Sequence, residues 1–284
     1  MKKFSDNFKE YQYFLDAKSD KADLTLDIYK RSISKFLNFF KIDTIEKLSK
    51  LNAVQIRSYI MGLDLKATSK NSTIRNLKSF FSWLFDNDFI SKNEMTKIKK
   101  LSEGTPVVKM PTIQEMDYVL ENCTNEITHL ILLLTSRVGL RRGELTEIKI
   151  SDIDENGRIY INGKGNRKAY RTLPKDIFEK IKSYIASKNR EESEYLFSYN
   201  GHKVSTTSIN LRLTAYINSL PISDDRKLTL RRVHAYRHRC GTTVYQKTKD
   251  LQSVKHILRH TNINMGQRYI HVEDSDFKGL SESL

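Results

Sequence analysis

The segment SEGTPVVKMPT, residues 102–112, limits how this chain can fold more than any other feature. It holds a glycine and two of the four prolines, and no proline precedes Pro106. Proline removes a backbone donor and glycine frees the backbone, so such a segment interrupts regular structure. The sequence therefore predicts a linker at residues 104–112 between two domains, residues 1–103 and residues 113–284.

Apolar residues before this linker recur at steps of three and four, which places them on one face of a helix. Three such series are Phe4, Phe8, Tyr11 and Leu15; Ile33, Phe36, Leu37 and Phe40; and Leu77, Phe80, Phe81 and Leu84. We interpret these stripes as the core of a helical bundle rather than as a surface that binds a ligand. The first domain is therefore expected to be helical throughout.

The region after the linker is expected to be helical with one β-rich insertion. Residues 158–174, RIYINGKGNRKAYRTLP, alternate apolar and polar side chains around a Gly-Lys-Gly turn, as a β-hairpin does. Helical patterns return in residues 207–217 and 234–246. The expected fold class is mainly α, with a small β-hairpin or sheet in an α+β second domain.

The charge balance indicates a polyanionic partner. The chain has 49 Lys and Arg against 34 Asp and Glu, a formal net charge of +15, with a pI near 9.6. Nucleic acid is the first candidate, although a solvated lysine-rich surface gives the same excess. No apolar stretch approaches the ~20 residues that a bilayer requires, so no membrane segment is expected. The two cysteines are far apart and no apolar run opens the chain, which favours a reduced, cytoplasmic protein.

Three short segments carry side chains that could act on an anion. Arg141 begins a new helix after Gly139, where it could bind an anion or form a surface ion pair with Glu144. Lys164 stands between glycines at the hairpin tip, where a phosphate could come close, although a hairpin tip also suits any lysine. His234 and Arg237 are three apart, so they could converge on one group or merely form a polar helix face.

Two histidine pairs raise the question of a metal. His256 and His260 are four residues apart, as are His234 and His238, and a helix would place each pair on one face. A metalloprotease signature needs a glutamate after the first histidine, and here the residues are isoleucine and alanine. Carboxylates for magnesium are not clustered, and the nucleotide-binding pattern GxxxxGK[ST] is absent. We therefore expect neither a metal nor a cofactor.

Taken in order, four segments of this chain resemble the sequence boxes of the tyrosine recombinases, also called phage integrases, and especially of their compact Xer-like members. The segments are GLRRGEL, GKGN, HAYRH and LRHTNINMGQRYIH. The resemblance implies a catalytic set of Arg141, Lys164, His234, Arg237, His260 and Tyr269. It also implies that the N-terminal bundle is a DNA-binding domain of the core-binding type, so that both domains clamp one duplex.

The family's chemistry needs no metal. A tyrosine, here Tyr269, attacks the DNA phosphate and forms a covalent 3′-phosphotyrosyl intermediate that keeps the bond energy for rejoining the strand. Planar guanidinium groups, here Arg141 and Arg237, would bind the non-bridging oxygens. Lys164 would protonate the leaving oxygen, with His234 and His260 assisting. His238 resembles a family position that supports the site.

The resemblance further implies a tetramer acting on two inverted-repeat DNA sites. The role would be chromosome dimer resolution and partition, or integration of a mobile element, in the cytoplasm at the nucleoid. Residues 270–284 would form an arm that docks on a neighbouring subunit, with docking on their own domain as the alternative. Two rival functions remain open: a type IB topoisomerase-like DNA-relaxing enzyme, and a non-catalytic DNA-binding module.

Two departures from the family pattern concern local backbone geometry. The last box usually opens Leu-Gly-His, whereas Arg259 stands here in place of the glycine. The hairpin that carries Lys164 is also slightly longer than the common form. Neither departure removes a catalytic residue.

Overall fold

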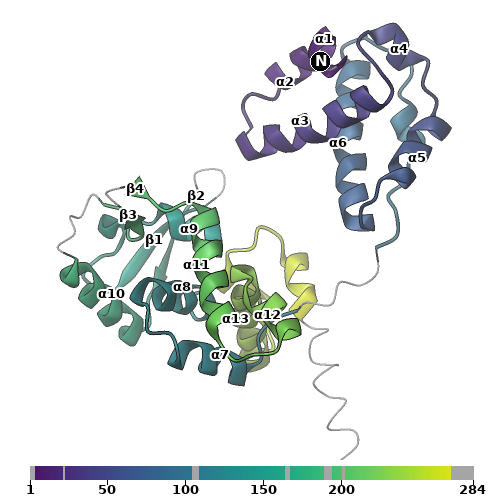
Figure 1. Ribbon diagram of the computed structural model, residues 1–284. Helices are drawn as coiled ribbons and strands as arrows, with labels where there is room; N and C mark the ends of the chain where they lie inside the picture. The colour runs from purple at the N-terminus through teal and green to yellow at the C-terminus, as the bar shows by residue number, and fades with distance from the viewer. Residues whose placement is uncertain are drawn as a thin grey trace, which may run out of the picture. The chain divides into compact units, whose positions relative to one another are not determined.

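The computed structural model describes residues 4–21, 23–103, 109–163, 167–188, 194–199 and 202–269. The chain divides into two compact units, Met1–Pro106 and Val107–Leu284, each with its own hydrophobic core (Figure 1). The expected positions of Lys164 and of the arm at residues 270–284 lie outside the described residues.

The first unit is helical over the described residues, as the aromatic periodicity predicts. Its elements are α1 (Phe4–Asn7), α2 (Lys9–Asp16), α3 (Asp23–Phe39), α4 (Ile45–Ser49), α5 (Ala53–Gly62), α6 (Ala67–Asp86) and the 3-10 helix η1 (Glu94–Lys97). Among these elements, α4 and α5 begin at side-chain caps. Thr44 accepts from the Lys47 N–H before α4, and Asn52 with Gln55 forms a capping box before α5.

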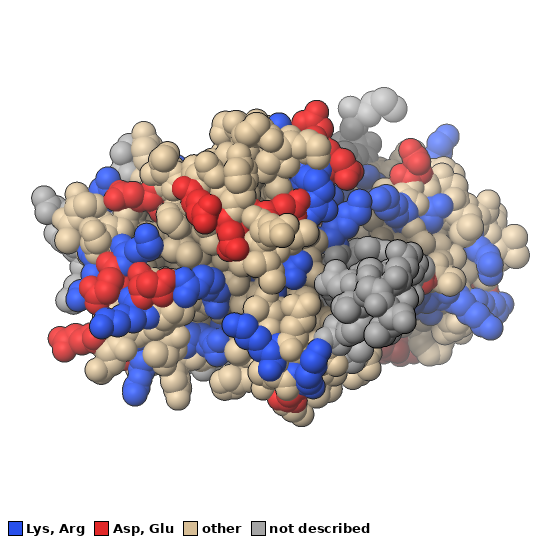
Figure 2. Space-filling model, turned by 90° about the horizontal axis from the view of Figure 1, so that it is seen from below, with Lys and Arg blue, Asp and Glu red and all other residues tan. Residues whose placement is uncertain are grey.

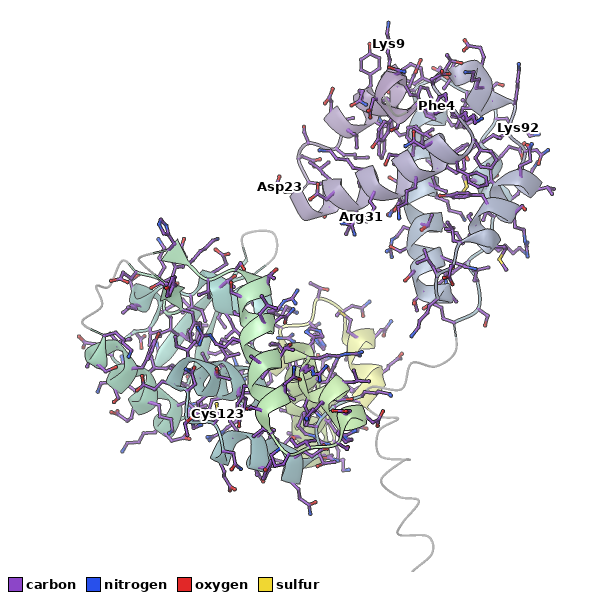
Figure 3. The ribbon with its side chains drawn as sticks, in the orientation of Figure 1. Phe4, Lys9, Asp23, Arg31, Lys92 and Cys123 are labelled. Carbon is purple, nitrogen blue, oxygen red and sulfur yellow. The ribbon has the colours of Figure 1, made fainter. Side chains whose placement is uncertain are left out.

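The core of the first unit is built on α6, which packs against α3 (Figure 1). The ring of Phe80 is fully buried and meets three rings of α2 and its N-cap edge-on, at centroid distances of 5.2 to 6.2 Å: Phe8, Tyr11 and Phe14. Edge-to-face pairs add to the stabilisation from area burial alone. The stripes are therefore a bundle core, and basic side chains such as Lys9, Arg31 and Lys92 are exposed around it (Figure 3).

The second unit is mainly helical with two small antiparallel sheets. Its helices are α7 (Ile113–Glu121), α8 (Glu126–Ser136), α9 (Arg142–Glu147), η2 (Ile150–Asp152), α10 (Lys175–Ser187), α11 (Thr206–Ser219), α12 (Asp224–Leu230), α13 (Val233–Thr248), α14 (Leu251–Leu258) and η3 (Ile263–Tyr269). Its strands are β1 (Arg158–Gly163), β2 (Arg167–Thr172), β3 (Ser198–Tyr199) and β4 (His202–Lys203). The fold class predicted from the sequence is confirmed.

The hairpin predicted in residues 158–174 is present. β1 pairs with β2 in antiparallel register, from Arg158 opposite Thr172 to Gly163 opposite Arg167. Ile159 and Ile161 point into the core and are nearly fully buried. The two-residue ladder of β3 and β4 has no counterpart among the sequence predictions, because strands this short leave no alternating pattern.

Helix α8 lies at the centre of the second unit and packs against α13, which carries the HAYRH segment. All residues from Leu130 to Ser136 are buried. A helix that is apolar around most of its circumference must be enclosed by others, so α8 fixes the position of the loop that follows it. That loop leads directly to Arg141.

The excess of basic residues is visible on the surface of the protein. Figure 2 shows lysine and arginine side chains spread over one face, with fewer acidic side chains among them. In the described part of the chain, no helix is long and apolar enough to cross a membrane. The basic face agrees with the polyanionic partner expected from composition.

Candidate active site

Gly139 brings Arg141 to the end of α14. Its φ is +72°, and an added Cβ would lie 2.8 Å from Leu258 Cδ2 and 3.2 Å from Cys240 Sγ. Two features therefore require a glycine at position 139: the left-handed backbone, and the close approach of side chains from α13 and α14. The chain then enters α9 with Arg141 as its N-cap, and the Arg141 guanidinium donates from Nη2 to the carbonyl of Arg259 at 2.9 Å.

Glu144 is a buried carboxylate shared by several arginines. Its Oε1 accepts from Arg141 Nη1 at 2.7 Å, and its Oε2 accepts from Arg259 Nη2 at 2.6 Å. The Nη1 of Arg237 lies 3.9 Å from the same Oε2. The ion pair between Arg141 and Glu144 considered from the sequence exists, but it is not a surface pair, because the glutamate side chain is only 7% exposed.

Arg237 is a fully buried cation on α13. It is 2% exposed and donates from Nη1 to the carbonyl of Gly139 and from Nη2 to the carbonyl of Leu258. These bonds tie α13 to the loop after α8 and to the end of α14. A buried guanidinium needs such partners, because leaving its donors without acceptors would cost the desolvation energy of each.

The site carries an excess of positive charge. Burial first, and then the charge of Arg141, lower the pKa of Arg237 to about 10. Burial and the charge of Arg259 also hold the pKa of Arg171 below its usual value. Burial would raise the pKa of Glu144, but the charges and hydrogen bonds of Arg259 and Arg141 outweigh it and lower that pKa. Three guanidinium groups around one shared carboxylate, with Arg171 close enough to Arg259 to be affected by its charge, favour the binding of an anion.

His260 and Tyr269 pack beside this cluster. The backbone turns after α14, where Arg259 has a φ of +52°, and the His260 N–H donates to the Lys255 carbonyl at 3.0 Å. The Tyr269 ring stacks on the His260 ring at a centroid distance of 6.2 Å and an interplanar angle of 9°. Tyr269 is 1% exposed, and an ionised Tyr269 would raise the pKa of Arg237.

Two histidines of α13 contact each other, and one of them, His238, lies close to the hydroxyl of Tyr269. His238 Nδ1 lies 3.1 Å from Tyr269 Oη, within hydrogen-bond distance. The His234 and His238 rings meet edge-on at 4.9 Å, and His234 is exposed. The structure thus brings together five of the six residues named from the sequence, namely Arg141, Arg237, His234, His260 and Tyr269, whereas Lys164 lies outside the described residues.

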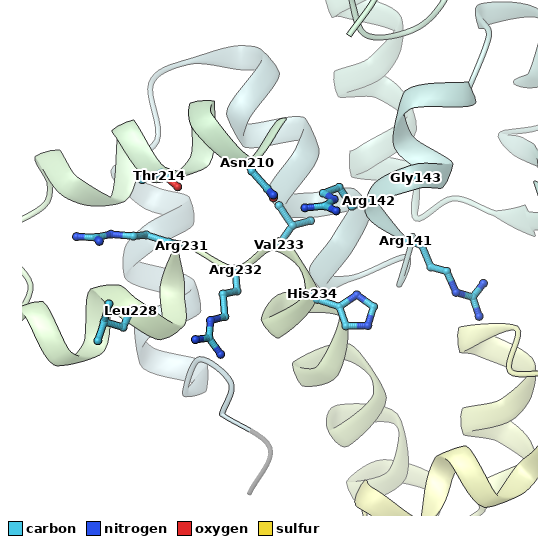
Figure 4. Close-up of a pocket in the computed structure, with 10 residues that line it drawn as sticks. All are labelled: Arg141, Arg142, Gly143, Asn210, Thr214, Leu228, Arg231, Arg232, Val233 and His234. Carbon is cyan, nitrogen blue, oxygen red and sulfur yellow. The ribbon is translucent and has the colours of Figure 1, made fainter. Parts of the chain in front are cut away.

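A hollow of about 670 Å³ opens beside this cluster (Figure 4). Its walls come from the start of α9, from α11 and from the junction of α12 with α13, and three arginines besides Arg141 line it: Arg142, Arg231 and Arg232. Arg141 and His234 lie next to each other at one side of the hollow in Figure 4. A concave surface lined by guanidinium groups suits a phosphate backbone.

The histidine spacing that raised the metal question does not produce a shared helix face at the end of the chain. Helix α14 ends at Leu258, so exposed His256 and buried His260 stand on opposite sides of the turn at Arg259. Within the described ranges, no group of three or more His, Cys, Asp or Glu side chains is arranged to hold a metal ion. In the other pair, His238 lies within hydrogen-bond distance of Tyr269 Oη and contacts the His234 ring.

Three residues of this site were not predicted from the sequence. Glu144 is the carboxylate that the arginines share, Arg259 is a third arginine near it, and Gly241 packs against the ring of Tyr269. Glu144 had been considered only as a surface partner. The unusual residue in the Leu-Arg-His segment was a signal for Arg259. Nothing in the local pattern marks Gly241, because its role depends on a contact with a distant residue.

Replacing Gly241 with Ala should displace the tyrosine. An added Cβ would lie 2.7 Å from Tyr269 Cζ and 2.7 Å from Leu258 Cδ1, too close for either atom to remain in place. If Tyr269 acts as a nucleophile, a shift of about 1 Å should slow covalent attachment to DNA by about 100-fold. The measurement is single-turnover adduct formation. Gly62→Ala is the matched control, because no atom beyond its chain neighbours and its own helix backbone lies within 4 Å of the added Cβ. An unchanged rate for Gly241→Ala would contradict this account.

Comparison with known families decides where the chain belongs. Residues 111–276 match the model described as the phage integrase family, which is more than half of the chain. The chain belongs to the phage integrase family. Residues 8–88 match the integrases' N-terminal SAM-like domain, in agreement with the helical first unit.

The chain is similar to tyrosine recombinases over nearly the full length of both proteins. The chain is 24% identical over 287 residues to a tyrosine recombinase XerC of Listeria welshimeri, covering 95% of this chain and 94% of the relative. It is 26% identical over 297 residues to a tyrosine recombinase of Pseudothermotoga lettingae, covering 100% and 99%. The tyrosine recombinase resemblance found in the sequence is confirmed.

Solved integrase structures share the fold. A XerH site-specific recombinase bound to a palindromic difH substrate gives a TM-score of 0.74 at 19% identity, covering 91% of this chain and 79% of that chain. A lambda integrase tetramer bound to a Holliday junction gives 0.71 at 17% identity, covering 92% and 76%. This chain therefore shares its fold with the recombinases in those complexes.

Proposed function

We propose that this chain is a site-specific DNA recombinase that cuts and rejoins strands through a covalent 3′-phosphotyrosyl intermediate. The observation that supports this most is the packing of Tyr269 and His260 beside a buried, positively charged arginine cluster in a member of the phage integrase family. Such a cluster can stabilise charge on a five-coordinate phosphorus without a metal, and a tyrosine beside it can attack that phosphorus.

Each proposed role follows from the chemistry of the side chain. Tyr269 is the nucleophile, and Arg141 and Arg237 stabilise the non-bridging oxygens through planar forks that a lysine cannot reproduce. Lys164 donates a proton to the leaving 5′ oxygen. His234 and His260 assist by hydrogen bonding at the phosphate and the tyrosine. No step requires a cofactor.

The partner is double-stranded DNA with an inverted-repeat site. Residues 1–103 form the DNA-binding domain, residues 104–112 the linker and residues 113–284 the catalytic domain with its C-terminal arm. The excess of lysine and arginine supports binding that weakens steeply with salt, since phosphate neutralisation releases counterions. Relatives crystallised as a dimer on a core site and as a tetramer on a Holliday junction support self-assembly into a tetramer on two sites.

The biological role that we propose is Xer-like. Relatives named XerC and XerD match over 90% or more of this chain, which supports chromosome dimer resolution in the cytoplasm at the nucleoid. Integration or excision of a mobile element uses the same strand chemistry and is the alternative. The choice depends on the DNA site.

The test first identifies the DNA site that the protein binds and then measures strand exchange between two copies of that site. The full chain is used to select duplexes from a random library, and the selected sequence is expected to be an inverted repeat. Two copies on one supercoiled plasmid should then yield two circles or an inverted segment, at the same rate with and without a chelator. The readout is the pattern of restriction fragments.

Three results would contradict the proposal in different ways. Relaxation of a one-site plasmid without exchange between two sites would favour the topoisomerase-like alternative. Binding without any covalent protein–DNA adduct would favour a non-catalytic DNA-binding module. Loss of activity with the chelator would show that the reaction depends on a metal.

A further inference from the structure

Arg259 has an unusual backbone for its residue type. It follows α14 with a φ of +52° and a ψ of +48°, in the left-handed region that favours glycine. A residue other than glycine keeps such a backbone only where its surroundings stabilise it, and such residues are frequent at functional sites. At Arg259 those surroundings are the arginine cluster.

The Arg259 side chain turns inward instead of extending into solvent. It is 12% exposed, and its Nη2 donates to Glu144 Oε2 at 2.6 Å and to the Gly139 carbonyl at 3.3 Å. The Gly139 carbonyl also accepts from Arg237 Nη1, so two arginines share one oxygen. Among the described residues, the buried Nε of Arg259 has no hydrogen-bond partner. Its Nη1 donates to the Ile257 carbonyl at 3.4 Å, so both terminal nitrogens of the guanidinium are anchored and only Nε is not.

The bond from Arg259 determines how the Glu144 carboxylate is shared among the arginines. Because Arg259 bonds to Oε2, Glu144 is fixed between two guanidinium groups, and Arg237 stays 3.9 Å from that oxygen. One negative charge thus serves Arg141, Arg237 and Arg259 together. The remaining positive charge is available to an anion, and like charges this close are tolerated only where an anion or a carboxylate offsets them.

Arg259 also lines a second hollow, at the end of α14. This hollow has a volume of about 400 Å³ and is lined by basic side chains that include Arg171, Lys255, His256, Arg259 and His260. The neighbour of Arg259 in sequence, His260, stacks on Tyr269. Arg259 therefore bonds to the shared carboxylate and also lines a cationic hollow to which His260, the ring neighbour of Tyr269, contributes.

We propose that Arg259 is a third arginine of the phosphate site, which adds its charge to that of Arg141 and Arg237 and holds Glu144 in the position that orients Arg141. This inference deepens the proposed function and rests on it. A glycine at this position would satisfy the backbone but supply neither the charge nor the bond to Glu144. Arg259 is thus a positioning residue that also raises the electrostatic potential at the scissile phosphate.

The test uses Arg259→Gly in the full-length chain. Glycine relieves the left-handed backbone, so a role limited to shaping the turn predicts no loss of cleavage. Our proposal predicts that single-turnover adduct formation at Tyr269 slows by about 10- to 100-fold, at or below the loss expected for one preorganised donor. Arg259→Lys keeps a charge without the fork and should lie between Arg259→Gly and the unmodified chain.

A matched control separates the backbone from the site. Lys249 ends α13 with the same φ of +52°, so Lys249→Gly also replaces a left-handed cation by glycine, and its adduct rate should match that of the unmodified chain. DNA-binding affinity and a thermal melt are measured for every variant. These measurements show that each chain is folded and saturated with DNA.

A neutral substrate tests the electrostatic role directly. Replacing one non-bridging oxygen of the scissile phosphate by methyl removes the negative charge that Arg259 is proposed to stabilise, so the defect of Arg259→Gly should be much smaller on this DNA. Equal defects on both substrates, or no defect on ordinary DNA, would overturn the role of Arg259 and leave the recombinase function standing. Absence of any adduct with the unmodified chain would overturn both.

Discussion

Tyr269→Phe is expected to abolish covalent attachment to DNA while leaving DNA binding intact. Phenylalanine keeps the ring that stacks on His260 and fills a site that is 1% exposed, so the packing should survive. It removes the hydroxyl, which lies 3.1 Å from His238 Nδ1 and is the atom proposed to attack phosphorus. Loss of the nucleophile should lower adduct formation by more than about 10³-fold, as it does in other covalent enzymes.

The measurement is trapping on a nicked suicide substrate, where cleavage releases a short fragment and the protein remains attached. Tyr245→Phe is the matched control, because Tyr245 packs against the same small hydrophobic cluster as Tyr269. It should form adduct at the rate of the unmodified chain. If Tyr269→Phe still forms adduct, then another of the fourteen tyrosines is the nucleophile.

The parts of this fold that were predictable are those set by local sequence. Three- and four-residue spacing of Phe80, Phe81 and Leu84 identified a core helix, and alternation in residues 158–174 identified the hairpin. The order of the arginine, histidine and tyrosine segments then identified the family. These features can be read from residue type and spacing because helices and strands have fixed periods.

The geometry of the site was not predictable to the same degree, because it depends on contacts between distant residues. Arg141 and Arg259 are 118 residues apart and share Glu144 only after α8, α13 and α14 have packed. Spacing of four residues suggested that His256 and His260 share a helix face, but the left-handed turn at Arg259 separates them. The interpretation of Arg141 as a surface ion pair was likewise incomplete, since burial changes what an ion pair does.

Arg237→Ala should impair both catalysis and folding. Removal of the guanidinium leaves the Gly139 and Leu258 carbonyls without these donors and removes a charge from the cluster. We expect the free energy of unfolding to fall by about 1–3 kcal/mol, because the Leu258 carbonyl loses its side-chain donor while the Gly139 carbonyl keeps the bond from Arg259. Adduct formation should fall by roughly 10²–10³-fold beyond any loss of folded protein, as for one preorganised donor. Chemical denaturation and single-turnover trapping measure the two effects separately, and a folded alanine variant that still cleaves at the normal rate would contradict the proposed role.

Arg237→Lys separates charge from geometry through its dependence on pH. Burial and the charge of Arg141 lower the pKa of Arg237 to about 10, so the arginine stays protonated near neutral pH. A lysine has an ordinary pKa of about 10.4 and would feel the same two influences, which shift the pKa of any buried cation downward. Because a cation with a lowered pKa is protonated at low pH and loses its charge as pH rises, the rate of Arg237→Lys relative to the unmodified chain should fall between pH 6 and pH 9.

Taking the ratio of the two rates removes the titration of the histidines and tyrosines that both proteins share. A ratio that is low and independent of pH would mean that the planar fork matters and the charge does not, whereas a ratio near one at every pH would mean that Arg237 does not stabilise the reacting phosphate.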